Sequence, residues 1–193
     1  MYKRQVFDRI DAMPNLGEQW EDADMDGFGD NPTGPLSDEC PAASGISYFF
    51  VQGCDDYEHD GFADDIDACD TNKGRSVFDR FGCPDYDEDG WSNNDGTWVN
   101  GDRFQQNWKQ AKDSDGDGVG DNYGVDCCDA IFGLSGAVET SPGDKFPYNP
   151  RQYKDFDGDG FGDNESDTLT GDFCPWDYGT SYRDRNGCPD SDG

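Results

Sequence analysis

An acidic motif of the form Asp-x-Asp/Glu-x-Asp-Gly recurs five times in this chain and limits its fold more than any other feature. Three long copies align without gaps and each ends in Gly-Asp-Asn, at residues 22–31, 113–122 and 155–164. Two shorter copies follow a cysteine, at 56–61 and 85–90, and a sixth begins at Asp190 and stops within the motif. Self-similarity of this kind is typical of strung units that depend on their neighbours for stability.

The charge of the chain makes a bare fold unfavourable. Among 193 residues, 44 Asp and Glu stand against 14 Lys and Arg, which gives a formal charge of −30 that opposes compaction. Composition alone favours an acidic, solvated, disordered chain. The regular spacing of the acids, the eight cysteines and the 14% of aromatic residues favour order instead. Bound divalent cations would cancel charge and crosslink the chain, so we expect folding to depend on them.

The spacing of the acids is that of a calcium loop. Acids at positions 1, 3 and 5 turn toward one centre when the backbone curls, and the glycine at position 6 permits the turn. Position 7 offers its carbonyl and position 9 a further carboxylate. The apolar side chain at position 7 should point away from the ion into contacts between units. The predicted ligands are Asp22, Asp24, Asp26, Phe28 and Asp30; Asp56, Glu58, Asp60, Phe62, Asp64 and Asp67; Asp85, Asp87, Asp89 and Trp91; Asp113, Asp115, Asp117, Val119 and Asp121; Asp155, Asp157, Asp159, Phe161 and Asp163; and Asp190 and Asp192.

Other ions and other loop folds fit this pattern less well. Magnesium prefers rigid octahedral sites with retained water. Zinc prefers His and thiolate ligands, and His59 is the one histidine of the chain. A helix–loop–helix site needs an acid at position 12, where the long loops carry Thr33, Gly124 and Ser166. The loop at 85 has Asn93 at position 9, which predicts a weaker or more hydrated site.

Six cysteines form three pairs with one spacing of 14 residues, and the predicted disulfides are Cys40–Cys54, Cys69–Cys83 and Cys174–Cys188. Local disulfides imply an oxidising compartment. The adjacent Cys127 and Cys128 are left over, and either a vicinal disulfide or a bridge to another chain would use them.

The predicted fold is an irregular, loop-dominated, disulfide-stapled repeat rod with short β segments, such as Ile46–Gln52, and single helical turns. We expect tandem units at about 11–54, 55–83, 84–128 and 129–193, and no separate catalytic domain. The unfinished loop at Asp190 suggests that a following repeat or subunit completes it.

The segment from Asp56 to Cys69 resembles a thrombospondin type 3 repeat, with acids at positions 1, 3, 5, 9 and 12 and then Cys. Most of residues 11–193 resembles the tandem Asp-rich repeats of large archaeal and bacterial secreted or surface proteins. The residues that carry this likeness are Met13-Pro14, Gln19-Trp20, the loop at 22–31, Cys40-Pro41 and the run from Asp79 to Asp85. The resemblance implies calcium-loaded extracellular rods or stalks.

The leading functional hypothesis is structural: stacked Ca²⁺ sites that rigidify an extracellular or cell-surface stalk or a self-assembling filament. The alternative is an adhesin-type module that binds glycans or proteins through exposed aromatics (Trp20, Trp91, Trp98, Trp108 and Trp176). No Ser/His/Asp set is visible, so we expect no enzyme. The acidity argues against nucleic acid as a partner, and no apolar run suggests a membrane span.

Overall fold

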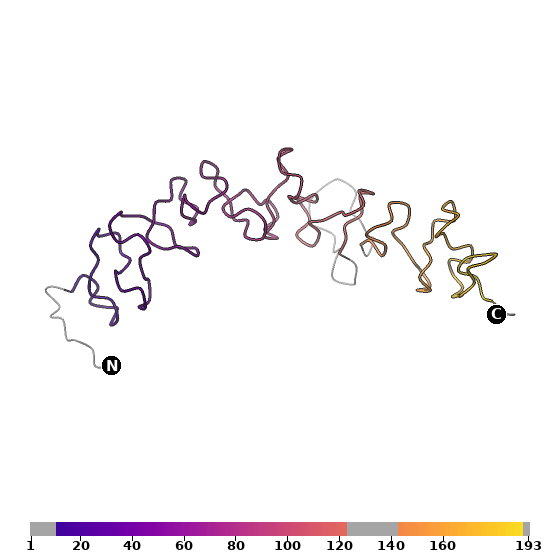
Figure 1. Ribbon diagram of the computed structural model, residues 1–193, viewed down its shortest axis with the longest axis horizontal. Helices are drawn as coiled ribbons and strands as arrows, with labels where there is room; N and C mark the ends of the chain where they lie inside the picture. Colours follow the sequence, from indigo (N-terminus) through magenta and orange to yellow (C-terminus); the bar gives the residue numbers. More distant parts are fainter. Residues whose placement is uncertain (1–10, 123–142, 191–193) are drawn as a thin grey trace. The chain divides into compact units, whose positions relative to one another are not determined.

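The computed structural model describes residues 11–122 and 143–190, and these residues contain no helix and no extended strand (Figure 1). Isolated parallel bridges join Gly29 to Ser37 and Gly162 to Gly171. The loop-dominated, disulfide-stapled architecture predicted from the sequence is therefore confirmed. Cys127, Cys128 and Asp192 lie outside the described residues.

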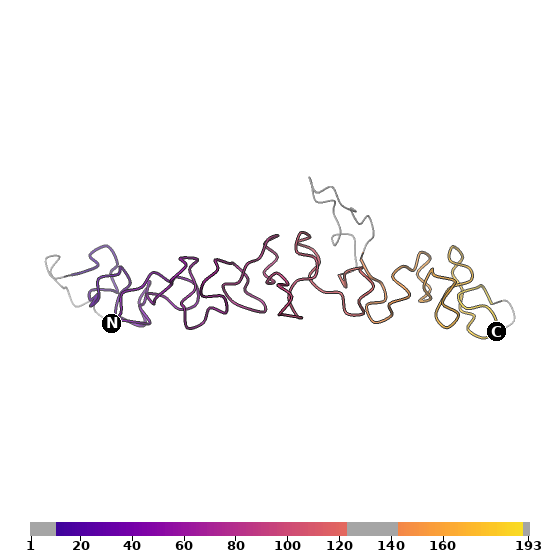
Figure 2. The ribbon, with the colours of Figure 1, turned by 90° about the horizontal axis from the view of Figure 1, so that it is seen from above.

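The chain divides into two compact units, Met1–Asn93 and Asn94–Gly193. Within each unit the backbone runs as successive small loops, each lying beside the previous one in both views (Figures 1 and 2). The four tandem repeats expected from the sequence stay a prediction.

Each acidic loop reverses direction through two residues with left-handed backbone. In the loop at 22, Met25 at position 4 has φ of 65° and Gly27 at position 6 has φ of 97°. Glycine tolerates this region freely, whereas a side chain at position 4 makes it unfavourable. The other loops repeat the pair: His59 (63°) and Gly61 (106°), Glu88 (62°) and Gly90 (92°), Gly116 (82°) and Gly118 (94°), and Gly158 (78°) and Gly160 (97°).

A buried glutamine fastens each long loop to the turn that precedes it. Gln152 is fully buried; its Nε2 donates to the carbonyl of Asn164 at 3.0 Å, and its Oε1 accepts the amide of Asn164 at 2.9 Å. A Cβ on Gly162, at position 8, would lie 2.1 Å from that Oε1, so the contact requires glycine there. Gln19 with Asn31 and Gln110 with Asn122 make the same pair of bonds. We call these three contacts the glutamine clamps.

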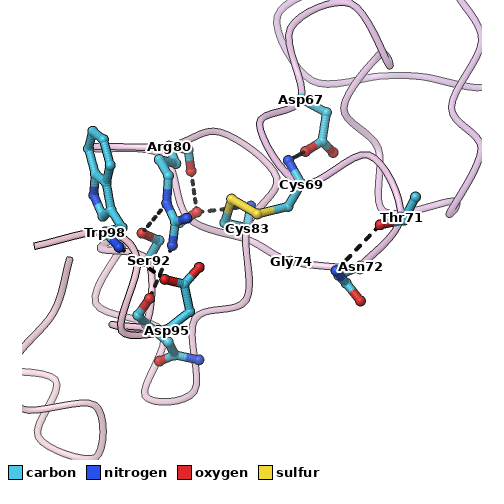
Figure 3. Close-up of a disulfide and its surroundings, with 12 residues drawn as sticks. Asp67, Cys69, Thr71, Asn72, Gly74, Arg80, Cys83, Ser92, Asp95 and Trp98 are labelled. Carbon is cyan, nitrogen blue, oxygen red and sulfur yellow. Dashed lines mark hydrogen bonds between the residues drawn. A yellow bond between two sulfur atoms is a disulfide. The ribbon is translucent and has the colours of Figure 1, made fainter.

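All three predicted local disulfides are present: Cys40–Cys54, Cys69–Cys83 and Cys174–Cys188, each across 14 residues. Figure 3 shows the second, where the carboxylate of Asp67 accepts the amide of Cys69 at 2.5 Å. A buried serine hydroxyl accepts the amide of the second cysteine in two of them, Ser47 for Cys54 (2.9 Å) and Ser76 for Cys83 (3.0 Å). Three such disulfides are typical of an oxidising, extracellular-type environment.

The apolar contacts are small and local. Phe62, at position 7 of its loop, is 1% exposed, and its ring centroid lies 5.0 Å from that of Phe49 and 6.1 Å from that of Phe50. The segment Ile46–Gln52 was predicted as a β segment, and this is wrong. The amides of Tyr48 and Phe49 both donate to the carbonyl of Gly61, and Phe50 has φ of 58°, so the segment curls around the loop at 56.

Candidate metal centres

The structure brings several of the predicted acids together within their loops. Ligand atoms of each of five groups lie within 4.8 Å of one another: Asp22, Asp24 and Asp26; Asp56, Glu58 and Asp64; Glu58, Asp60 and Asp67; Asp85, Asp87 and Asp89; and Asp113, Asp115 and Asp117. These groups could hold a metal ion.

The first acid of each loop fixes the curl by accepting backbone amides. Asp22 Oδ1 accepts the amide of Met25 at 2.7 Å, and its Oδ2 accepts that of Gly27 at 3.1 Å. The positive φ at positions 4 and 6 turns these amides inward. The same pair of bonds forms at Asp56 with His59 (2.7 Å) and Gly61 (2.9 Å), Asp85 with Glu88 (2.8 Å) and Gly90 (2.8 Å), Asp113 with Gly116 (2.7 Å) and Gly118 (3.2 Å), and Asp155 with Gly158 (2.7 Å) and Gly160 (3.1 Å).

Positions 5 and 9 also brace the loop. Asp117 Oδ1, at position 5, accepts the amide of Val119 at 2.8 Å, and Asp121 Oδ1, at position 9, accepts the amide of Ser114 at 2.8 Å. In the other four loops the side chain at position 5 likewise accepts the amide of position 7, from Phe28, Phe62, Trp91 and Phe161. The side chain at position 9 accepts the amide of position 2, from Ala23, Tyr57, Tyr86 and Phe156. In the loop at 85 the acceptor at position 9 is the amide oxygen of Asn93, so this residue keeps the bracing role without the charge. The carbonyl ligands proposed for position 7 stay a prediction.

Position 3 differs, because it carries buried oxygens that accept no hydrogen bond. Both carboxylate oxygens of Asp24 and of Glu58 are in this state, as are Oδ2 of Asp115 and Oδ2 of Asp157. A buried carboxylate oxygen without a partner is strongly unfavourable unless a cation or a proton compensates it. These oxygens therefore mark where a cation would bind.

Three further buried carboxylates lie beside the long loops and were missed by the sequence analysis. Asp38 is 5% exposed, and Asp144 and Asp172 are each 1% exposed. In all three, Oδ1 accepts the amide two residues later, at 2.6–2.7 Å, and the buried Oδ2 accepts no hydrogen bond. The sequence signal was weak: an acid two residues before Cys or Phe, at varying distances from the loop.

Burial and then crowding of like charges raise the pKa of two of these carboxyl groups. Burial raises the pKa of Asp144 to about 6, and repulsion from Asp117, Asp115 and Asp121 adds to the effect. Burial raises the pKa of Glu58 to about 7, and the close approach of the Asp67 carboxyl and repulsion from Asp60 add to the effect. Without a cation the loops therefore hold mutually repelling carboxylates at close range.

Two loops also receive a basic side chain on their first acid. Arg103 Nη1 lies 3.5 Å from Asp113 Oδ2, and Lys145 Nζ lies 3.5 Å from Asp155 Oδ2. Ala12 stands at the same distance before the loop at 22 and carries no charge. Its amide donates to the carbonyl of Trp20, just ahead of that loop. These contacts leave the oxygens of position 3 uncompensated.

No protein-family model matches this chain, and comparison with the curated proteins finds no relative. The likeness to thrombospondin type 3 repeats therefore stays a resemblance carried by the residues of the loops. None of residues 11–122 and 143–190 forms a helix with the length and apolar character that crossing a bilayer would need.

Proposed function

We propose that this chain is a structural, extracellular calcium-binding repeat protein whose ions hold its loops in place. The observation that carries the proposal is the recurrence of one loop geometry with buried carboxylate oxygens at position 3 that no protein donor satisfies. Five loops brace themselves through positions 1, 5 and 9, and in four of them position 3 keeps at least one buried oxygen without a donor, at Asp24, Glu58, Asp115 and Asp157.

The donor set favours calcium. The clustered ligand atoms are carboxylate oxygens, which hard cations prefer. The six described cysteines are used in disulfides and offer no thiolate, and His59 is the one histidine of the chain, so the ligands that zinc prefers are scarce. Loops of irregular backbone adapt to calcium's variable coordination better than to magnesium's strict octahedron.

In this proposal the ions take the place of a hydrophobic core. Calcium neutralises part of the charge of −30 and ties together segments that share few apolar contacts. The result is a stiffened stalk or a self-assembling filament, and the partner is a neighbouring repeat or another copy of the chain.

Calcium dependence can be tested on the full chain. We expect stripped protein to bind several calcium ions, counted by equilibrium dialysis and elemental analysis, and its thermal unfolding temperature to rise with calcium. Magnesium at equal concentration is the control and should give a smaller rise. Electron microscopy with and without chelator then tests the stiffened form. Unchanged stability and shape after stripping would contradict the proposal.

One observation keeps the adhesin alternative open. A pocket of about 430 Å³ in the first unit is lined by Phe49, Phe62 and Phe78 together with Arg75, Asp85 and Glu88 among others, a mixture of rings and charges suited to a sugar. A glycan-array signal lost in Phe78→Ala and kept in Tyr148→Ala, an exposed aromatic in the other unit, would favour this function.

A further inference from the structure

We propose that Asp38, Asp144 and Asp172 are the closing ligands of the three long-loop metal centres, reached across a variable insertion. The proposal rests on the proposed function, because it adds a ligand to the same sites. We call these three residues the closing acids.

The backbone holds each closing acid against its loop in the same way. The amide of Asp38 donates to the carbonyl of Gly29 at 2.9 Å, and Gly29 is position 8 of the loop at 22. The amides of the other two donate to position 8 of their own loops, Asp144 to Gly120 at 2.8 Å and Asp172 to Gly162 at 2.7 Å.

In the short loop at 56 the same backbone bond is made by an acid that lies among the other acids of the loop. The amide of Asp67 donates to the carbonyl of Ala63, again position 8, at 2.9 Å, and Asp67 belongs to an acidic group with Glu58 and Asp60. Asp67 follows the first acid by 11 residues, whereas the closing acids follow theirs by 16, 31 and 17. The long loops therefore have an equivalent of the position-12 ligand, but inserted residues place it further along the sequence.

The Asp38 side chain lies beside a loop acid. A Cβ built on Gly53 would lie 2.2 Å from Asp38 Oδ1 and 3.3 Å from Asp26 Oδ2, so both carboxylates border one point. Burial and then repulsion from Asp26, Asp24 and Asp30 raise the pKa of Asp38, which agrees with that placement.

Asp172 shares the backbone bond to position 8 and the buried second oxygen with Asp38. Burial, followed by repulsion from Asp159, Asp157 and Asp163, raises its pKa. Its Oδ2 accepts no hydrogen bond although the side chain is 1% exposed. A residue that served only as a turn cap would use its Oδ1, which receives the amide of Cys174, and would have no reason to bury a second charged oxygen.

Asp38→Asn and Asp172→Asn test the proposal in the full chain. Asparagine still accepts the amide two residues later through its Oδ1, so the turn is preserved. The matched controls are Glu39→Gln and Asp177→Asn, exposed acids near each site that lose the same charge. Calcium binding is measured by competition with a chromophoric chelator, and stability by thermal unfolding of stripped and calcium-loaded protein.

We expect each closing-acid variant to bind one calcium ion about 10- to 100-fold more weakly than the parent, a loss typical of impaired metal sites, while the controls match the parent. Stripped closing-acid variants should unfold at a higher temperature than the parent, because a buried unpaired charge is gone, and loaded variants at a lower one. If the parent binds calcium and the closing-acid variants bind it with the same affinity, the role of the closing acids is overturned and the proposed function is not. Failure of the parent to bind calcium overturns the proposed function as well.

Discussion

At the residue scale, the acids of a loop divide into two roles. Asp22, Asp26 and Asp30, at positions 1, 5 and 9, spend oxygens on the loop's own amides, whereas both oxygens of Asp24 accept no hydrogen bond. The bracing acids hold the curl through the loop's own amides, and in the proposed function position 3 is the group that would bind the cation. The backbone supports this division by adopting positive φ at position 4 in every described loop, whether or not that residue is glycine.

The strained position 4 gives a prediction for Met25→Gly. Met25 is 86% exposed, so little packing is lost, and φ of 65° is unfavourable for a side chain by about 1–2 kcal/mol. Glycine's greater freedom in the unfolded chain offsets part of this, and we expect a net gain of up to about 1 kcal/mol. Chemical denaturation of calcium-loaded protein would measure it.

Two controls accompany that variant. Gly158→Met introduces the strain at an equivalent position of the loop at 155 and should destabilise the protein. Ala23→Gly, at an exposed neighbour without positive φ, should lower stability slightly. Equal effects of Met25→Gly and Ala23→Gly would show that the backbone at position 4 is not strained.

The clustering of acids within a loop could be predicted from the sequence because they are close neighbours along the chain, as Asp22, Asp24 and Asp26 are. Their role as metal ligands stays a prediction. Asp38, Asp144 and Asp172 escaped prediction because the bond that places them joins backbone atoms, and their distance from the loop varies. The curl of Ile46–Gln52 was missed for a similar reason, since its β-like side chains contact a neighbouring loop instead of a strand.

At the scale of the element, two devices hold a loop to its surroundings. The glutamine clamp joins a long loop to the turn before it, and a disulfide closes the segment after the loops at 22, 56 and 155. The long loop at 113 has the clamp, but Phe146 occupies the place taken by the first cysteine elsewhere. The two devices are therefore separable.

Loss of a clamp should destabilise the protein with little effect on the ion's own ligands. In Gln152→Ala two hydrogen bonds disappear and the amide and carbonyl of Asn164 lose these partners, for which we expect a loss of about 2–3 kcal/mol. Gln106→Ala, at an exposed glutamine, is the control. Denaturant unfolding in saturating calcium would measure both, and equal stability of the two variants would contradict the clamp.

Calcium should slow the reduction of the three local disulfides. The acids Asp38, Asp67 and Asp172 each accept the amide of the first cysteine of a pair, so an ion bound by the acid also restrains the cysteine. Thiol labelling during treatment with a reductant, with and without calcium, would measure the rate. Reduction at the same rate in both conditions would separate the disulfides from the ion sites.

At the scale of the whole molecule, we expect charge to govern the stability of the fold. The chain carries a formal charge of −30 and concentrates it in loops where carboxylates repel one another. The dependence of the protein's stability on pH should therefore reverse when the ions are removed.

The metal-stripped protein should become more stable on acidification from pH 7 to about 4.5. Asp144 has a raised pKa of about 6 and faces Asp117, Asp115 and Asp121. The pKa of Glu58, facing Asp67 and Asp60, is raised to about 7. Because the folded state binds these protons more tightly than the unfolded state, their stabilisation is full at low pH and is lost as pH rises through the raised values.

Calcium-loaded protein should show the opposite trend, because the ion favours the ionised carboxylates that acid protonates. Thermal unfolding between pH 4.5 and 7 of resin-stripped and loaded protein tests both directions. A stripped protein that loses stability on acidification would contradict the repulsion inferred from the loops.

The closing acids turn each ion into a reversible loop closure, and the length of the closed loop then matters little. Closing a loop costs entropy that grows only with the logarithm of its length, about 0.6 kcal/mol for each doubling. The span from Asp113 to Asp144 is 31 residues, nearly twice the 16 from Asp22 to Asp38. By that relation the longer span weakens calcium binding only about threefold, so such a centre can accept an inserted segment between position 9 and its closing acid and still capture its ion.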